Sequence, residues 1–442
     1  MAERMNRRAF IRAAGAGAGA LLVACTSDPA AVRGPGSERF GALRSDPEAT
    51  LDLPRGFRYK ILQQPDDTLS DGAALPGRPD GMGAFEADDG ATLLIRNHEL
   101  EPGDGPAVEG TNPFDPGAPG GTTALLVSAE REAIESYVCS SGTDSNCAGG
   151  ATPWDTWLTC EETTNEGHGY VFEVTPGASE DDLSKTPIEG MGRFSHEAAA
   201  VDPETGVVYL TEDDSPVSFL YRYIPDDTSG RPGSLHSGGR LQALGIEEEE
   251  DPEGFAAGDR FAERWLDVDP TDANSSAQDV GGVRFRRLEG ADFAEGVLWF
   301  NDTEGGDLRL GRTYRYTPGS QSLELFFESD EQSEMKNPDN SIVAPWGDLL
   351  FVEDARSGNR MMGVSPQGEA YELALNRLNG SELAGPCFSP DGRTLFVNFQ
   401  DPGITFALWG PFPEASAERR RLLAAAPPGR QPSIPVRRDR GH

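Results

Sequence analysis

Basic residues are scarce in this sequence, and lysine is almost absent. The 442 residues include 38 lysines and arginines against 74 aspartates and glutamates, which gives a formal net charge of −36. Three of the basic residues are lysines, at Lys60, Lys185 and Lys336. A chain this acidic repels the phosphate backbone of nucleic acids, so we exclude nucleic acid as a binding partner. The same charge favours a soluble protein that tolerates or recruits cations.

Helical periodicity is also scarce. The chain alternates short apolar, β-branched stretches with Gly, Pro and Asp turns, which is typical of β-strands. No change in composition marks a second domain after the N-terminal region. We therefore expect one all-β domain with loop and short-helix insertions, such as residues 229–277, in which residues 261–265 indicate a helix.

One kind of segment recurs six times: an apolar strand that ends in acidic or amide side chains. The copy with the strongest signal is Trp157-Leu158-Thr159-Cys160-Glu161-Glu162, with no neighbouring lysine or arginine to neutralise it. The other copies end in Asn97-His98-Glu99, Glu212-Asp213-Asp214, Asn301-Asp302, Glu353-Asp354 and Asn398. One copy alone indicates a solvated turn. Six copies, spaced by roughly 45 to 90 residues, indicate a β-propeller whose strand ends point at a common centre.

A second element precedes three of these strands and places a carboxylate where the chain enters each unit. These residues are Glu197, Glu289 and Asp339, which we expect to converge with Glu161 and Glu162. Clustered carboxylates suit calcium, which takes six to eight oxygen ligands. A thiolate at Cys160 suits a softer metal such as iron or zinc, so the pattern predicts a mixed metal site in the central channel. The alternative for Cys160 is an inert buried thiol.

The remaining cysteines and two histidines have less specific signals. Cys139 and Cys147 flank a polar loop and could close a small disulfide, and Cys387 is typical of a buried apolar residue. His98 and His196 are either metal ligands or structural residues, and their settings favour structure.

The N-terminus carries an export signal. Arg7 and Arg8 stand before a short apolar stretch that ends in Leu22-Val23-Ala24-Cys25, a pattern typical of twin-arginine export with lipid attachment at Cys25. We assign residues 1–25 to the signal, 26–46 to a linker, 47–412 to the propeller and 413–442 to a disordered tail. The twin-arginine translocase is then a partner, and the mature protein is periplasmic or on the cell surface, with a possible lipid anchor.

The chain resembles the PhoX-type alkaline phosphatases. The residues that carry the resemblance, besides the twin arginines, are Arg96-Asn97-His98-Glu99, Thr156 to Glu162, Phe194-Ser195-His196-Glu197, Arg287-Leu288-Glu289-Gly290 and Pro338-Asp339-Asn340. The resemblance implies a six-bladed β-propeller with iron and calcium in its central channel that hydrolyses phosphomonoesters. Leu288 stands where many members have proline, and Thr163 where asparagine is common, which puts the substrate and the full calcium set in question.

The resemblance also implies roles for individual residues. Arg287 contacts phosphate and, with Glu289, is assigned to catalysis. The implied metal ligands are Cys160, as the iron-binding thiolate, together with Glu161, Glu197, Glu289 and, with weaker correspondence, Glu99, Glu162 and Asp339.

The expected reaction is attack of a metal-bound oxygen on phosphorus, with the phosphate held by clustered cations and Arg287. The sequence contains neither a Walker-type phosphate loop nor a Gly-x-Ser-x-Gly nucleophile elbow. Two alternatives stay open. One is a calcium-dependent propeller hydrolase of the lactonase type, and the other is a non-catalytic, calcium-stabilised binding propeller.

Overall fold

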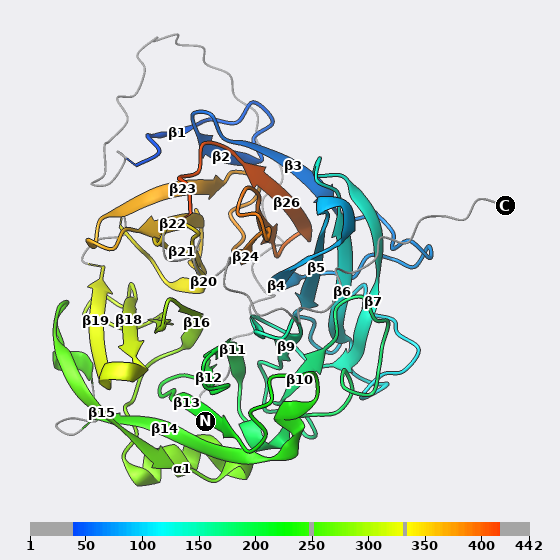
Figure 1. Cartoon of the computed structure of the whole chain (residues 1–442). Coiled ribbons are helices and arrows are strands. Elements are labelled where there is room, and N and C mark those ends of the chain that lie inside the picture. The colour runs from blue at the N-terminus through cyan, green and yellow to red at the C-terminus, as the bar shows by residue number, and fades with distance from the viewer. Residues whose placement is uncertain (1–38, 247–251, 330–333, 416–442) are drawn as a thin grey trace, which may run out of the picture. The chain divides into compact units, whose positions relative to one another are not determined.

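Strands dominate the computed structural model, which describes residues 39–246, 252–329 and 334–415 (Figure 1). The signal at 1–25 with Cys25, the linker as far as residue 38 and the tail beyond residue 415 lie outside the described residues. Within the described part of the chain, no helix is long and apolar enough to span a membrane.

The strands form five sheets among the described residues, and their pairs are antiparallel. The first sheet contains β4 (Pro79–Glu86), β5 (Thr92–His98), β6 (Gly120–Val127) and β7 (Ala133–Thr143). The second contains β8 (Gly150–Ala151), β9 (Trp157–Cys160) and β10 (Val171–Val174). The third has nine strands: β11 (His196–Val201), β12 (Val208–Glu212), β13 (Leu220–Pro225), β14 (Gly239–Ile246), β15 (Arg260–Asp267), β16 (Leu288–Ala294), β17 (Val297–Asp302), β18 (Arg312–Thr317) and β19 (Ser322–Glu328).

The last two sheets include strands from both ends of the described chain. One contains β1 (Leu43–Arg44), β2 (Leu51–Pro54), β20 (Pro338–Val343), β21 (Leu349–Glu353), β22 (Arg360–Val364) and β23 (Ala370–Asn376). The other contains β24 (Leu383–Phe388), β25 (Leu395–Phe399), β26 (Ile404–Trp409) and β3 (Arg58–Gln63). Pairing of β3 with β26 joins an N-terminal strand to a C-terminal one.

The nine-stranded sheet consists of two antiparallel meanders that β15 connects. The first part of β15 pairs with β19, and the rest pairs with β14. Because of this shared strand, the fold is an all-β, propeller-like arrangement of five sheets and not of six separate ones. Residues 261–265, expected to be helical, lie in β15, where Trp265 packs against Tyr209 and Tyr316.

The described helices are short and lie between strands. The one α-helix among these residues is α1 (Ala273–Val280), which ends at Gly281 in the left-handed conformation. The 3₁₀ turns are η2 (Asp88–Gly90), η3 (Glu189–Met191), η4 (Ser234–Ser237), η5 (Pro252–Gly254), η6 (Pro270–Asp272) and η7 (Pro318–Ser320).

One strand from each meander or small sheet takes part in a closed cycle of contacts, and Figure 1 shows β4, β11, β16, β20 and β24 around the centre of the ring. The six strands contact one another in the cyclic order β4, β8, β11, β16, β20, β24 and back to β4. We call these the inner strands. Hydrophobic clusters fill the spaces between neighbouring sheets, so the ring is held by side-chain packing as well as by strand pairing.

The packed structure includes residues that the sequence assigns to a linker. Phe40 lies against Phe57, Trp346 and Tyr371, and Arg39 pairs with the buried Asp348 at 2.7 Å. Residues 39–46 are therefore part of the fold, because an aromatic cluster of the β20–β23 sheet binds them.

Five inner strands carry a β-bulge near their start, where two residues oppose one on the neighbouring strand. The bulges pack backbone against backbone around the axis. At Gly290, for example, a Cβ would overlap the carbonyl oxygen of Asp339 and lie 2.6 Å from Ser341 N. Glycine is required there by close approach of the next inner strand.

Candidate functional site

Two positions in each unit place side chains at the channel. Each inner strand and the strand that follows it in the chain form one unit. The first position is on or just before the inner strand, directly after the residue that pairs with the last paired residue of the following strand. For example, Pro79 pairs with His98 and Asp80 follows it, while His196 pairs with Glu212 and Glu197 follows it. The residues at this first position are Asp80, Cys147, Glu197, Glu289 and Asp339.

The second position is the residue directly after the last paired residue of the strand that follows the inner strand. It is occupied by Glu99, Glu162, Asp213, Thr303, Asp354 and Gln400. Residues of both positions interact electrostatically across the channel: Glu162 with Asp213, Glu197 and Glu99, and Glu289 with Asp354. We call these residues, together with Glu382, the acidic ring.

The acid immediately before the second position has a different role. Glu161 is fully buried and accepts hydrogen bonds from His168 Nδ1 at 2.7 Å, Gly169 N at 2.8 Å and Asp144 N at 2.9 Å. Its carboxylate therefore orders a loop and does not face the channel. The structure does not bring Glu161, a predicted metal ligand, into the channel, because hydrogen-bond donors already occupy both of its oxygens.

Glu212 and Glu353 repeat the arrangement of Glu161. Glu212 accepts hydrogen bonds from Phe219 N and Tyr221 Oη, and Glu353 pairs with Arg360 at 2.7 Å. In each case the next residue, Asp213 or Asp354, belongs to the acidic ring. The strand direction explains the division, since successive side chains of an extended chain point to opposite sides.

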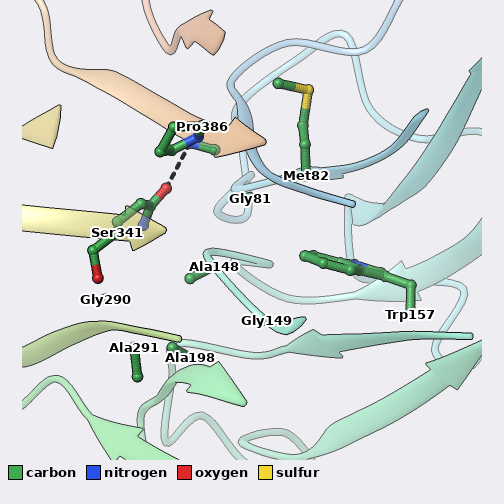
Figure 2. A pocket seen from close by; sticks show the side chains of 12 residues that line it. Gly81, Met82, Ala148, Gly149, Trp157, Ala198, Gly290, Ala291, Ser341 and Pro386 are labelled. Carbon is green, nitrogen blue, oxygen red and sulfur yellow. Dashed lines mark hydrogen bonds between the residues drawn. The ribbon is translucent and has the colours of Figure 1, made fainter. Parts of the chain in front are cut away.

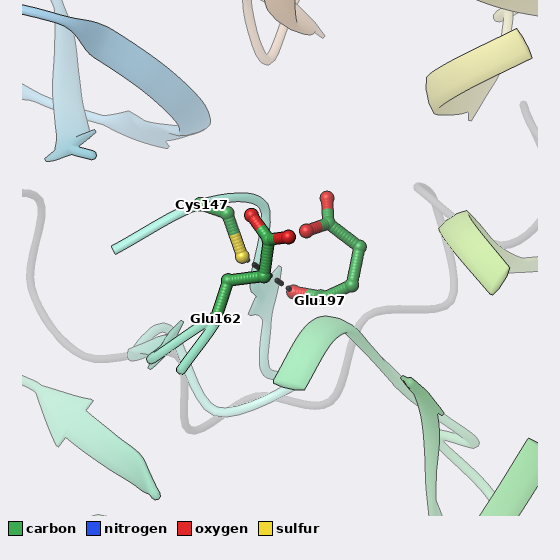
Figure 3. A group of neighbouring side chains, drawn as sticks. All are labelled: Cys147, Glu162 and Glu197. Atoms are coloured by element: carbon green, nitrogen blue, oxygen red, sulfur yellow. Dashed lines mark hydrogen bonds between the residues drawn. The ribbon is translucent and has the colours of Figure 1, made fainter. Parts of the chain in front are cut away.

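Cys147, Glu162 and Glu197 form the most compact group of metal-binding side chains among the described residues. One ligand atom from each lies within 4.8 Å of the others. Figure 3 shows the Glu162 and Glu197 carboxylates pointing toward one another beside the Cys147 thiol. Sequence reasoning missed Cys147 as a ligand, although it precedes β8 just as Glu197 and Glu289 begin other inner strands.

Cys160 does not belong to this group. It is fully buried in the same hydrophobic cluster as Cys147, and burial raises the pKa of both thiols well above the ordinary value. Unlike Cys147, it has no ligand atom near those of Glu162 and Glu197 among the described residues. Cys160 directly precedes Glu161. The residues at the equivalent position in four other units are Asn97, Thr211, Asn301 and Asn398. The structure therefore places Cys147 beside two ring carboxylates, whereas the sequence predicts Cys160 as the thiolate of the site.

The residues Asn97, Thr211, Asn301 and Asn398 fix the ligands of the next unit. Asn97 Nδ2 donates to the Cys147 carbonyl at 2.6 Å, and Thr211 Oγ1 donates to the Glu289 carbonyl at 2.6 Å. Asn301 and Asn398 donate in the same way to the carbonyls of Asp339 and Asp80, at 2.8 and 2.7 Å. Four of the five first-position residues, all except Glu197, are thus held by a hydrogen bond from the neighbouring unit.

Asn340 connects three inner strands at the floor of the site. Its Nδ2 donates to Asp339 at 2.7 Å and to Glu197 at 3.3 Å, and its Oδ1 accepts from Gly385 N at 2.6 Å. Below it lies a cavity of about 50 Å³, lined largely by glycine and alanine together with Met82 and Trp157 (Figure 2). This volume holds a water molecule or two but no phosphate ester.

Burial removes water from the carboxyl groups of the acidic ring and so disfavours their charged form. It raises the pKa of Asp80 to about 6 and that of Glu99 to about 7, with neighbouring acids adding to the effect. The pKa values of Glu162, Glu197, Glu289, Asp339 and Glu382 are raised well above the ordinary value for the same reason. Asp80 Oδ1 is buried without a hydrogen-bond partner in the described structure. This donor set of carboxylates with one thiol fits hard cations together with one softer metal.

Arg287 is one of two arginines that contact the ring carboxylates. Its guanidinium bonds both oxygens of Asp213 at 3.1 Å, Asp354 at 3.2 Å and Glu289. Glu289 in turn accepts from Thr303 Oγ1 at 3.1 Å. The predicted pair Arg287 and Glu289 therefore lies in the ring, as do Glu99, Glu162, Glu197 and Asp339.

The histidines and the remaining cysteines serve structure. His98 bonds Gly77 O and Thr123 Oγ1, His196 bonds Gly192 O, and burial lowers the pKa of each to about 3. Cys139 and Cys147 are free thiols, so the possible disulfide is not formed. Cys387 is buried, as expected.

The fold and the site together define an all-β, propeller-like protein with a metal-binding channel. The sequence profile of the family described as Alkaline phosphatase PhoX matches residues 38–403. The chain therefore belongs to the PhoX family of alkaline phosphatases, which are metal-dependent phosphoester hydrolases, and this excludes a non-catalytic binding propeller.

Solved structures agree with the fold. Pseudomonas fluorescens PhoX in complex with vanadate, a transition state analogue, matches with a TM-score of 0.64 at 17% identity, over 85% of this chain and 97% of that one. A gluconolactonase from Xanthomonas campestris matches with a TM-score of 0.39 at 13% identity, over 76% of this chain and 100% of that one. The second score is too low to support the lactonase alternative. No curated protein sequence matches the chain.

The two buried thiols predict opposite results on substitution. Cys147→Ser removes the one soft ligand of the Cys147–Glu162–Glu197 group, so bound iron, measured by elemental analysis, should fall steeply. Cys160→Ser is the matched control. It should cost about 1–2 kcal/mol of stability and leave the iron content unchanged. Loss of iron from the Cys160 variant with full iron in the Cys147 variant would reverse the assignment.

The raised carboxyl pKa values predict an unusual dependence of stability on pH in metal-depleted protein. The folded ring binds more protons than the unfolded chain between about pH 4 and 7, so the free energy of unfolding should fall as pH rises through this range. Melting temperatures should therefore drop by several degrees from pH 5 to pH 7.5 without metals, and added calcium and iron should remove most of that drop. A flat profile without metals would contradict the electrostatic account of the ring.

Proposed function

We propose that this chain is an exported phosphomonoesterase that uses iron and calcium. The observation that carries the proposal is the placement of Cys147 with Glu162 and Glu197 inside a larger ring of carboxylates. A thiolate with carboxylates suits iron, and the other acids suit calcium. The cyclic contact of six inner strands supports a six-bladed propeller, with β15 shared between two blades.

The residues that would hold the metals come from both channel positions. We assign Cys147, Glu162 and Glu197 to iron. Glu99, Glu289 and Asp339, with Asp80 beside them, are the oxygen donors left for calcium, and Asn340 holds Asp339 and Glu197 in place. When bound, the metals neutralise phosphate oxygens and act as Lewis acids that activate water.

Arg287 binds the phosphate oxygens in this proposal. Asp213 accepts from Nε and Nη2 of the guanidinium, which fixes its plane, and Glu289 and Asp354 also accept from Nη2. The N–H groups of Nη1 make none of these bonds and are the donors left for phosphate oxygens. About one fifth of the Arg287 side chain is exposed.

Export and lipid attachment also belong to the proposal. Arg7 and Arg8 with the Leu22–Cys25 stretch, all in the sequence before the described residues, support twin-arginine transport and an anchor at Cys25. Export in folded form suits a protein whose metal ligands come from units far apart in the chain.

Substitution of Arg287 tests the phosphatase directly. With 4-nitrophenyl phosphate and metal-loaded protein, Arg287→Gln should lower kcat/KM by roughly 10- to 100-fold, since a charge-assisted hydrogen bond contributes about 1.5–3 kcal/mol. Arg287→Lys should recover only part of this loss, because lysine lacks the planar fork. The exposed Arg284→Lys is the control. Unchanged turnover in Arg287→Gln would remove this residue from the site, and no turnover in the native protein would overturn the phosphatase.

The export proposal has its own test. A variant with both Arg7→Lys and Arg8→Lys should accumulate as a precursor in the cytoplasm, while the native chain is processed and recovered with the envelope. Cys25→Ser should still be exported and should lose incorporation of labelled fatty acid. Normal export of the twin-lysine variant would contradict twin-arginine transport. A native protein that carries no lipid would contradict the anchor at Cys25.

A further inference from the structure

Arg78 occupies the same position in its unit as Arg287. Each arginine stands two residues before a ring carboxylate, Asp80 or Glu289, and three before a glycine of an inner-strand bulge. Both backbones are left-handed, with φ of 46° at Arg78 and 54° at Arg287. A left-handed arginine is uncommon, so its occurrence twice at one position indicates the same local geometry and the same side-chain level at the channel.

The two arginines lie on opposite sides of the ring. β4 and β16, which follow them, are separated by two inner strands in either direction around the cycle, and Figure 1 places them across the centre from each other. Asp354 connects the two sides, since it bonds Arg287 and interacts electrostatically with Asp80 and Glu99. The side of the ring opposite Arg287 is therefore the side of Arg78.

The guanidinium of Arg78 is fixed but only partly used. Its Nε donates to Glu99 O at 2.6 Å and its Nη2 donates to Glu99 Oε2 at 2.9 Å, while its other three N–H groups have no hydrogen-bond partner among the described residues. About 29% of the surface of the Arg78 side chain is exposed. The same Glu99 oxygen accepts from Gln400, which also bonds Asp80, so these contacts hold Arg78 at the ring.

We infer that Arg78 is a second anion-binding residue of the site, and that it favours phosphomonoesters whose leaving group carries its own negative charge. This rests on the proposed phosphatase function, with the transferred phosphoryl group at Arg287. The leaving group then points across the channel, where carboxylates would repel an anionic group. Arg78 supplies the compensating charge on that side, and its free N–H groups match a carboxylate.

Two substrates that differ in one group test the inference. Glycerol 3-phosphate and 3-phosphoglycerate share a phosphomonoester on three carbons, and only the second carries a carboxylate. In Arg78→Gln, the ratio of kcat/KM for 3-phosphoglycerate to that for glycerol 3-phosphate should fall about tenfold. Arg78→Lys should restore part of the ratio, and the exposed Arg55→Gln should leave it at the native value.

Metal content and binding separate the possible failures. Iron should stay at its native level in Arg78→Gln, because Arg78 bonds none of Cys147, Glu162 and Glu197. A proportional loss of both activities, or an unchanged ratio, would overturn the inference and limit Arg78 to holding Glu99. If the native protein hydrolyses neither compound, the proposed function fails. Calorimetry with the same two compounds then decides the inference, which stands if Arg78→Gln removes a binding preference for 3-phosphoglycerate and falls if it does not.

Discussion

Repulsion among buried carboxylates is the constraint on which the rest of the structure depends. Nine acids meet at the channel, namely Asp80, Glu99, Glu162, Glu197, Asp213, Glu289, Asp339, Asp354 and Glu382, and two arginines contact them. The Glu162 and Glu197 oxygens, within 4.8 Å of each other, repel by roughly 3 kcal/mol when both are charged. Cations relieve this repulsion, and the packed ring supplies the rigidity that holds the carboxylates together against it.

The ring resists that repulsion because four of its units each hold a channel residue of the next unit by a hydrogen bond. A ligand such as Asp339 is part of β20, yet its carbonyl is held by Asn301 of the adjacent β17. The glycines of the bulges allow inner strands to approach at backbone distance, which leaves no room for the ligands to separate. The site is therefore a property of the closed ring, and no single sheet could form it.

Much of the architecture could be predicted from the sequence, and the error in the site has a physical cause. Strand-period patterns and turn residues predicted the all-β ring, and recurring acidic strand ends predicted its centre. The sequence could not predict which individual side chains point into the channel. The sequence favours Glu161 and Cys160 and gives Cys147 only as a possible disulfide partner, because it does not show which of several nearby polar residues faces the axis. Asp213 and Asp354 stood in the recognised strand ends, but only hydrogen bonding to Glu212 and Glu353 shows that the second acid of each pair enters the ring. Residues 261–265 form strand and not helix because they pair with two partners, β14 and β19, and the second is distant in sequence.

The central claim is that Cys147 and not Cys160 is the thiol of the metal centre, together with Glu162 and Glu197. X-ray diffraction from crystals of the protein purified with its metals, recorded on both sides of the iron absorption edge, tests it most directly. The account predicts an anomalous iron peak between the Cys147 sulfur and these two carboxylates, with density for lighter cations at other ring acids. An iron peak at the Cys160 sulfur, or a ring with no metal density at all, would contradict it.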